Sequence, residues 1–174
     1  MKKIFATVLF CAAALQVNAQ DFTHSLGFRF ASGHYDNVGV AYKVFVTKPG
    51  ALEFDLGFAN NKYHGEKIGS WSISGAYQHH FPIGDVKNFK WFVGGGLVVA
   101  NTDDHHYNAG GTDVAIFPTG GVEYRLKKAP FVFSADLRPT FHLTNNYESN
   151  YHGHHHSHIN NSFVNFGLTA RYVF

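Results

Sequence analysis

The feature that most constrains the fold of this chain is a regular alternation of large apolar residues with small or polar ones. It is clearest in the last fourteen residues, 161–174, where one alternate set is apolar and rich in aromatic side chains. The opposite set is largely polar. Because successive side chains of a β-strand point to opposite faces, this pattern predicts a strand with one apolar face.

Eight alternating segments can be counted: 22–31, 38–47, 51–59, 70–81, 89–100, 113–126, 131–143 and 161–174. Each is close to the ~9–11 residues that a tilted strand needs to cross the hydrocarbon core of a membrane. The connections alternate between longer polar loops and short turns that contain Pro or Gly. We therefore expect an all-β fold: an eight-stranded antiparallel up-and-down transmembrane β-barrel. Its short turns and both termini would be periplasmic, and its longer loops extracellular.

The last strand carries a further signal. It ends on a Phe and places apolar residues at alternate positions, namely Phe166, Leu168, Ala170, Tyr172 and Phe174. This ending resembles the terminal strand of bacterial outer-membrane β-barrels, where it serves as an assembly signal. The chain as a whole resembles the small OmpA/OmpX-type outer-membrane barrels. The resemblance implies an integral outer-membrane protein of a Gram-negative bacterium, surrounded by outer-membrane lipid and lipopolysaccharide and assembled by the barrel assembly machinery. A soluble eight-stranded β-barrel or sandwich is the alternative, but a soluble barrel would pack its large residues inside.

The first nineteen residues predict a secretory signal peptide. Two lysines precede the apolar run 4–15, and a small-residue site ends at Ala19. We expect cleavage after Ala19, which leaves the barrel domain over 20–174 and removes Cys11, the only cysteine. Of the 14 basic residues, Lys2 and Lys3 would be removed, which leaves 12 basic and 12 acidic residues. This balance gives no argument for nucleic acid as a partner.

The smaller face of the predicted strands carries charges of both signs. The residues are Arg29, Lys43, Glu53, Asp55, Glu123, Arg125, Asp136, Arg138 and Arg171. In an eight-stranded barrel this face points into a lumen that is barely wide enough for its own side chains. Because buried charges must be paired, we expect a salt-bridged network that holds the barrel and blocks conduction. Nearer the loops the same face is small or apolar, which predicts either a closed packing or a cup open to the outside.

Two prolines, Pro118 and Pro139, lie on the sixth and seventh segments, and a symmetric turn at 127–130 would place them opposite each other. Since neither has an N–H, strand pairing should weaken there. Such a wall resembles the lateral lipid access of the outer-membrane palmitoyltransferase, and His34 is a loose positional match to the catalytic histidine of that family. The alternative function is therefore lipid or small-hydrophobe binding in the outer half of the lumen, with or without lipid A modification.

The sequence lacks other features of the two lipid A-modifying enzyme families, the palmitoyltransferase and the deacylase. No amphipathic helix precedes the first segment, and the second loop has no Asp-Ser pair. The run 155–157, His-His-Ser, is a formal match to the His-x-Ser of lipid A deacylase barrels, but no Glu follows residue 148. Because a serine without such partners is not an activated nucleophile, we expect no catalytic residues.

Histidine gathers in the predicted extracellular loops, which hold nine of the 13 in the sequence. The candidate ligands are His152, His154, His155, His156 and His158 in the fourth loop, and Asp103, Asp104, His105 and His106 in the third. Imidazole and carboxylate bind zinc and other divalent metals. We expect metal binding here without a required cofactor; the alternative is a solvated loop that gains charge below pH ~6.5. The sequence thus predicts a non-catalytic structural or surface-binding barrel, whose loops contact metal or another extracellular ligand.

Overall fold

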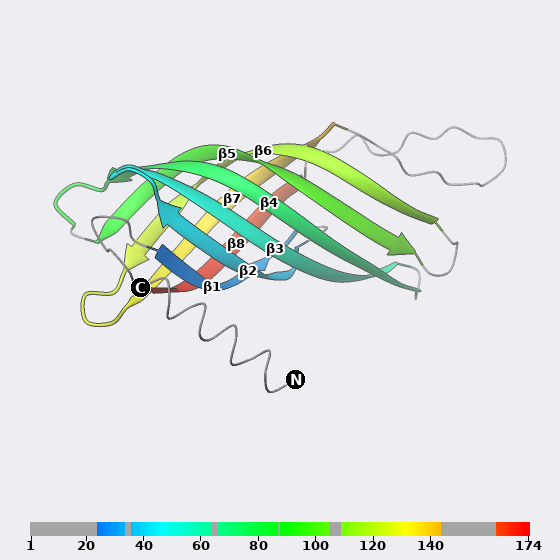
Figure 1. Ribbon diagram of the computed structural model, residues 1–174, viewed down its shortest axis with the longest axis horizontal. Helices are drawn as coiled ribbons and strands as arrows, with labels where there is room; N and C mark the ends of the chain where they lie inside the picture. Colours follow the sequence, from blue (N-terminus) through cyan, green and yellow to red (C-terminus); the bar gives the residue numbers. More distant parts are fainter. Residues whose placement is uncertain (1–23, 34–35, 64–65, 87, 105–108, 144–162) are drawn as a thin grey trace.

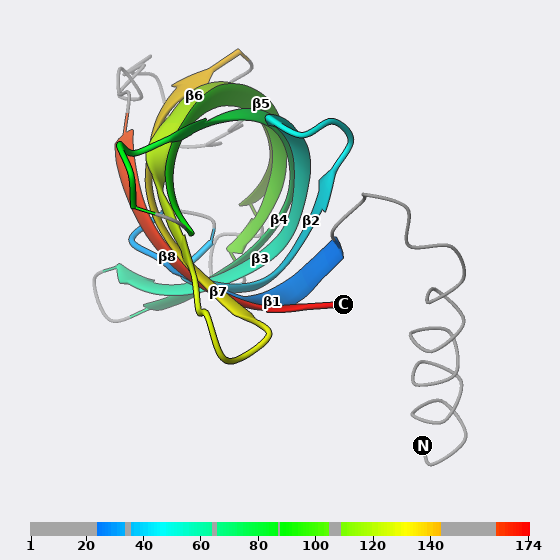
Figure 2. The same cartoon turned by 90° about the vertical axis from the view of Figure 1, so that its left-hand side faces the viewer.

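The computed structural model describes residues 24–33, 36–63, 66–86, 88–104, 109–143 and 163–174. They form eight strands: β1 (His24–Ala31), β2 (Val38–Phe45), β3 (Gly50–Tyr63), β4 (Glu66–Pro82), β5 (Phe89–Asp104), β6 (Ala109–Arg125), β7 (Phe131–His142) and β8 (Phe163–Val173). Each strand pairs antiparallel with the next, and β8 pairs with β1 to close the barrel (Figures 1 and 2). The predicted eight-stranded up-and-down barrel is confirmed. No helix in the described part of the chain is long and apolar enough to cross a membrane. The proposed signal peptide, 1–19, lies outside the described residues.

The barrel has two distinct ends. We call one the turn end: it carries the connections 46–49, 83–88 and 126–130, together with His24 and Phe174, and lies at the left of Figure 1. The other is the loop end, where β1 joins β2, β3 joins β4, β5 joins β6 and β7 joins β8.

The wall is taller on one side than the alternating pattern predicts. The loop expected over 60–69 is largely strand, because β3 runs to Tyr63 and β4 begins at Glu66. Strands β3 to β6 have 14 to 17 residues, whereas β1 and β2 have 8 each. Backbone pairing continues where the side chains turn polar, since it needs no apolar face. In this region Asn101 Nδ2 donates a hydrogen bond of 3.3 Å to Thr112 Oγ1 across the β5–β6 ladder.

The two faces of the wall are sorted inversely to those of a soluble barrel. Large apolar side chains around the outside, such as Phe28, Leu97 and Val164, are 38–61% exposed. Inside, the largest fully buried side chains among the described residues are Arg29, Arg171, Lys43, Phe92, Gln78 and Glu53. The aromatic face of β8 points outward with the rest: Phe166, Leu168 and Tyr172 are all exposed. The core of this protein is therefore its charged lumen.

Candidate functional site

A network of buried ion pairs fills the middle of the lumen. Eight of the nine charged residues that the sequence predicts on this face are at most 7% exposed: Arg29, Lys43, Glu53, Asp55, Glu123, Asp136, Arg138 and Arg171. Four are cations and four are carboxylates, so the set is balanced. They come from β1, β2, β3, β6, β7 and β8, and their contacts therefore cross the lumen as well as follow the wall.

Glu53 lies at the centre of this network. Its Oε1 accepts hydrogen bonds from Arg138 Nη2 at 2.5 Å and from Gln78 Nε2 at 3.1 Å. Its Oε2 accepts one from Arg171 Nη1 at 2.6 Å and lies 3.3 Å from Lys43 Nζ. One carboxylate thus joins β3 to β2, β4, β7 and β8. Removing one partner of such a buried pair leaves an uncompensated charge, at a cost of about 3–5 kcal/mol.

Toward the loop end, Arg138 and Arg29 share one carboxylate. Arg138 Nη1 donates to Asp55 at 2.6 Å, and its Nε donates to Asp136 at 3.0 Å. Arg29 binds Asp136 through both of its terminal nitrogens, at 2.5 and 2.9 Å. Two parallel hydrogen bonds of this kind fix geometry as well as charge. Gly167 makes room for this pair, since a Cβ there would lie 2.2 Å from Arg29 Nη2.

Toward the turn end, Glu123 is the carboxylate that two cations share, as Asp136 is toward the loop end. It accepts hydrogen bonds from Lys43 Nζ at 2.8 Å and from Arg171 Nη2 at 2.7 Å. His80 Nε2 lies 3.8 Å from the same carboxylate and 3.4 Å from Lys43 Nζ. Lys43 Nζ also lies 4.9 Å from the centre of the Phe92 ring. Ring and carboxylate together compensate the buried ammonium group.

Asp36, which the alternating pattern did not predict, lies between β1 and β2 and adds a fifth carboxylate to the network on the loop side. Its Oδ2 lies 3.7 Å from Arg29 Nε, and its Oδ1 accepts a 2.7 Å hydrogen bond from Asn165. Burial raises the pKa of Asp36 above its ordinary value, against the opposing effect of the Arg29 and Arg138 charges. Gly57 leaves space for it, since a Cβ there would lie 2.5 Å from Asp36 Cβ. The glycine is the only local sign of this contact that the sequence carries.

Arg125 is the one predicted network residue that the structure places elsewhere. It is the last residue of β6 and is exposed at the mouth of the turn end. The alternation put its side chain on the correct face, but at the strand terminus this face opens to water. Its guanidinium therefore needs no buried carboxylate, and the predicted role in the network is wrong for this residue.

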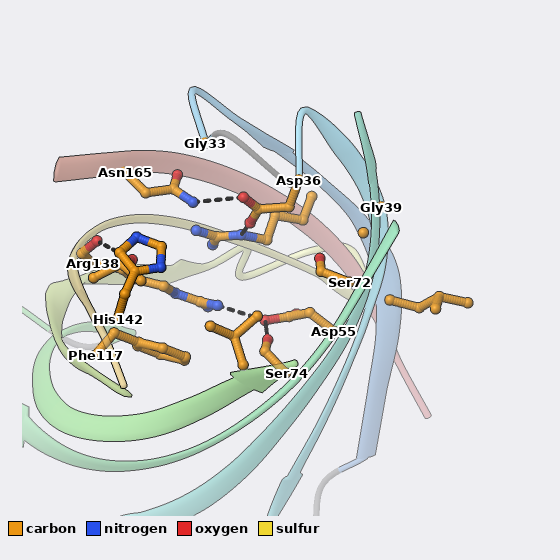
Figure 3. A pocket seen from close by; sticks show the side chains of 15 residues that line it. Gly33, Asp36, Gly39, Asp55, Ser72, Ser74, Phe117, Arg138, His142 and Asn165 are labelled. Carbon is orange, nitrogen blue, oxygen red and sulfur yellow. Dashed lines mark hydrogen bonds and ion pairs between the residues drawn. The ribbon is translucent and has the colours of Figure 1, made fainter. Parts of the chain in front are cut away.

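The loop half of the lumen holds charged side chains among small and apolar residues, and it leaves only a small cavity. Its cavity has a volume of about 40 Å³ and is lined by the charged residues Arg29, Asp36, Asp55 and Arg138 as well as by Phe117. Figure 3 shows Asn165 reaching toward Asp36, and Arg138 toward Asp55. A cavity of this size holds a few water molecules, whereas sites for drug-sized ligands measure roughly 300–1,000 Å³. Gly57, Ser72 and the longer Arg138 side chain line this cavity, and Asp36 occupies the space beside Gly57.

The wall between β6 and β7 is interrupted at the two prolines. Ladder pairs form at Ile116 with Phe141 and at Gly120 with Leu137, but at none of the three positions between them in this described part of the wall. This register places Pro118 opposite Pro139. The neighbouring β5–β6 ladder is unbroken from Phe89 to Asp104. The interruption follows from the absence of an N–H on either proline.

The histidine runs 105–106 and 152–158 lie outside the described residues, and of Asp103 and Asp104 only the backbone, at the end of β5, is described. Within the described ranges, no group of three or more His, Cys, Asp or Glu side chains is placed to hold a metal ion. His142 Nδ1 is hydrogen-bonded to Asp113, and His24 Nδ1 lies 2.7 Å from the Tyr42 hydroxyl. These two histidines therefore have structural partners.

Comparison with known proteins supports the fold. The sequence matches no protein-family model and no curated protein sequence. Its structure is similar to that of outer membrane protein H (OprH) of Pseudomonas aeruginosa, with a TM-score of 0.60 and 16% identity over 89% of this chain and 100% of that chain. It is also similar to the N-terminal β-barrel domain of P. aeruginosa OprF, with a TM-score of 0.53 and 16% identity over 89% and 98% of the two chains. At such low identity these similarities establish the barrel fold alone.

Proposed function

We propose that this chain, which has the fold of the small eight-stranded outer-membrane barrels, is an integral outer-membrane protein with a sealed lumen and a non-catalytic, structural or surface-binding role. The observation that carries the proposal is the inverted sorting of its side chains, with charges inside and large apolar groups outside. Such sorting suits a barrel surrounded by lipid.

The outside of the barrel supports this membrane location. Aromatic side chains with a polar atom, including Tyr77, Trp91, Tyr124 and Tyr172, are exposed near the turn end. The Trp91 and Phe81 rings stack there, with their centroids 4.4 Å apart. Outer-membrane barrels carry girdles of aromatic residues at the membrane interfaces. We place the turn end in the periplasm and the loop end outside, with lipid and lipopolysaccharide as surroundings and the barrel assembly machinery as the partner in biogenesis.

The ion-pair network supports a sealed lumen. The loop-end cavity of about 40 Å³ is bounded by Asp55 and Arg138, which belong to the network. Glu53, Arg138 and Arg171 then cross the lumen below it through contacts of 2.5 and 2.6 Å. An ion would have to break these buried pairs in order to pass.

The test is to refold residues 20–174 into phosphatidylcholine vesicles and then record from planar bilayers. We expect an unheated sample to migrate differently from a heated one on an SDS gel, as a folded barrel does, and the conductance to stay at baseline. The alanine variant of Arg138 serves as a leaky comparison, because it removes the side chain that joins three carboxylates. Steady channel openings by the parent protein would contradict the sealed lumen, and failure to insert would contradict the membrane location.

Metal binding at the loops is a second candidate. Strand order supports it: β5–β6 and β7–β8 connect at the same end of the barrel, and β6 and β7 are neighbours in the wall. The two loops that carry the histidine runs are therefore attached to neighbouring strands, β6 and β7. We propose that they bind a divalent metal such as zinc, tested by calorimetry beside a variant with the five histidines of 152–158 changed to Ala. Saturable binding tighter than about 1 μM, lost in this variant but kept in His34→Ala, supports the site. Binding that is weak and unsaturable in the parent protein contradicts it.

The lipid alternative has less support. The interrupted pairing at Pro118 and Pro139 favours it, but the cavity behind this wall is small and is lined by the charged side chains of Asp55 and Arg138. An acyl chain would have to displace Arg138 from its carboxylates. Unchanged lipid A mass after expression of the protein in a Gram-negative host is the expected result, and an added or missing acyl group would revive the alternative.

A further inference from the structure

We propose that the mouth of the barrel at the turn end is a binding site for a small oxyanion, a phosphate or carboxylate group carried on a compact organic molecule. A cavity of about 260 Å³ opens there, and three cationic side chains line it: Lys48, Lys90 and Arg125. The cavity lies at the end that faces the reader in Figure 2. It lies at the opposite end of the barrel from the loops that carry the histidine runs.

The cavity is built from most of the circumference of the barrel. Ser25, Phe45, Val132 and Val173 contribute from β1, β2, β7 and β8, and Asn88 from the turn before β5. Ser25, Val132 and Val173 are buried, so the inner part of the cavity, away from the mouth, belongs to the lumen. A ligand there is enclosed by hydroxyl, amide and apolar groups below the three cations. This combination suits a molecule with one charged group and a short carbon skeleton.

The Lys90 ammonium group and the backbone of Arg125 each have a defined contact at the cavity. Lys90 Nζ lies 5.4 Å from the centre of the Phe45 ring, across the mouth from its own strand. The backbone N–H of Arg125 donates a 2.9 Å hydrogen bond to the carbonyl of Asn88, which fixes the end of β6 against the β4–β5 turn. Asn88 adopts a left-handed backbone, with φ of 75°, a conformation that Asn tolerates better than most residues.

The charge of the mouth is unbalanced. Glu123 also lines the cavity and lies directly opposite Lys90 in the β5–β6 ladder. Its carboxylate is already bound by two buried cations, Lys43 at 2.8 Å and Arg171 at 2.7 Å. No carboxylate of the described residues lies within 4.0 Å of the charged nitrogens of Lys48, Lys90 or Arg125. Three cations therefore line a partly enclosed space, and none of them is paired with a carboxylate of the described residues.

The chemistry of these groups selects an oxyanion. A guanidinium presents a planar fork that matches two oxygens of phosphate or carboxylate, and each ammonium adds a compact charge. The volume exceeds that of an inorganic phosphate ion and fits a phosphate monoester such as glycerol 3-phosphate. The same group occurs free in solution and in the headgroups of anionic phospholipids. A cavity surrounded by the barrel wall favours the soluble source, and the two sources are separable by experiment.

The test uses the folded barrel in a maltoside detergent, which carries no phosphate, and titrates it with glycerol 3-phosphate. We expect calorimetry to show binding that saturates below about 1 mM, and NMR to shift the backbone amides of Ser25, Asn88 and Val132. Lys90→Gln and Arg125→Gln should each weaken binding about tenfold or more. The control is Lys128→Gln, an exposed turn residue that does not line the cavity; binding should stay within about twofold of the parent. Folding of each variant is checked by its unheated migration on an SDS gel.

A parallel arm places the protein in nanodiscs that contain either phosphatidylglycerol or phosphatidylcholine. Amide shifts at the mouth that need phosphatidylglycerol and disappear in Lys90→Gln identify a lipid headgroup as the source and support the site. Binding that never saturates in either arm overturns the proposal. So does an equal loss in Lys128→Gln, because it would mean that general surface charge and not the cavity attracts the anion.

Discussion

Arg29 and Asp136 are joined by two hydrogen bonds of 2.5 and 2.9 Å across the lumen, although 107 residues separate them in the sequence. Both side chains are almost completely buried. The pair joins β1 to β7, two strands that are not neighbours in the wall. It therefore braces the barrel independently of the backbone ladders.

Replacing Asp136 with Ala should destabilise the barrel by about 3–5 kcal/mol, because Arg29 loses its bidentate partner and Arg138 one of its three carboxylates. The measurement is urea unfolding in lipid vesicles, followed by the fluorescence of Trp71 and Trp91. Lys128→Ala, on the exposed β6–β7 turn, should change the free energy of unfolding by no more than about 0.5 kcal/mol. Equal effects of the two substitutions would mean that the ion pair contributes nothing measurable.

Gly167→Ala should destabilise the barrel through the same pair, because the new Cβ would meet the Arg29 guanidinium at 2.2 to 2.5 Å. Forcing a methyl group into packed surroundings costs typically 1–3 kcal/mol. The matched control is Gly69→Ala on β4, where the nearest atom to a new Cβ is Asn60 Oδ1 at 4.0 Å. Unfolding curves of the two variants in the same vesicles should separate clearly. Coincident curves would show that Arg29 moves aside without cost.

The proline interruption should make the β6–β7 wall the easier of two adjacent ladders to open. Amide hydrogens of Ile116, Gly120, Leu137 and Phe141, which point across the β6–β7 ladder on either side of the prolines, are expected to exchange with solvent deuterium faster than those at the centre of the β5–β6 ladder, because local pairing limits exchange. Hydrogen exchange by NMR in detergent micelles measures this directly. The double variant Pro118→Val/Pro139→Val restores both N–H donors and should slow exchange at the flanking amides. Rates equal to those of the β5–β6 ladder in the parent protein would argue against a weak wall.

The carboxyl of Asp36 should make stability depend on pH. Because its pKa is raised on folding, the folded state holds this proton more tightly than the unfolded state. Its contribution is therefore present below the unfolded pKa, about 3.9, and is lost as the pH rises through the folded pKa. Asp36→Asn cannot lose a proton, so the stability of the variant should improve relative to the parent as the pH rises above about 4. Parallel pH profiles of the free energy of unfolding would show that the environment of Asp36 does not shift its titration.

The strands and their faces could be predicted from the sequence because both follow from the local alternation of large apolar with small or polar residues. The same pattern placed eight of the nine charged residues in the lumen. It could not indicate which of them meet, since the contact of Glu53 with Arg171 depends on closure between β8 and β1. The role of Asp36 was missed for a related reason: it lies in a connection, and it reaches the lumen only because Gly57 has no side chain. The polar extension of β3 to Tyr63 was missed because backbone pairing there has no apolar signature.

The central contacts also constrain the order in which the molecule can form. Glu53 and Arg171 are 118 residues apart, and Arg29 and Asp136 are 107 apart. Until the last strand arrives, Glu53 and Glu123 lack the Arg171 guanidinium that joins them. The network can therefore be completed only after β8 has joined the sheet. Contacts between residues so far apart in the sequence also slow folding. In an unfinished sheet these charged side chains lack some of their partners and face the surroundings. Only the closed barrel pairs them and shields them from the lipid bilayer.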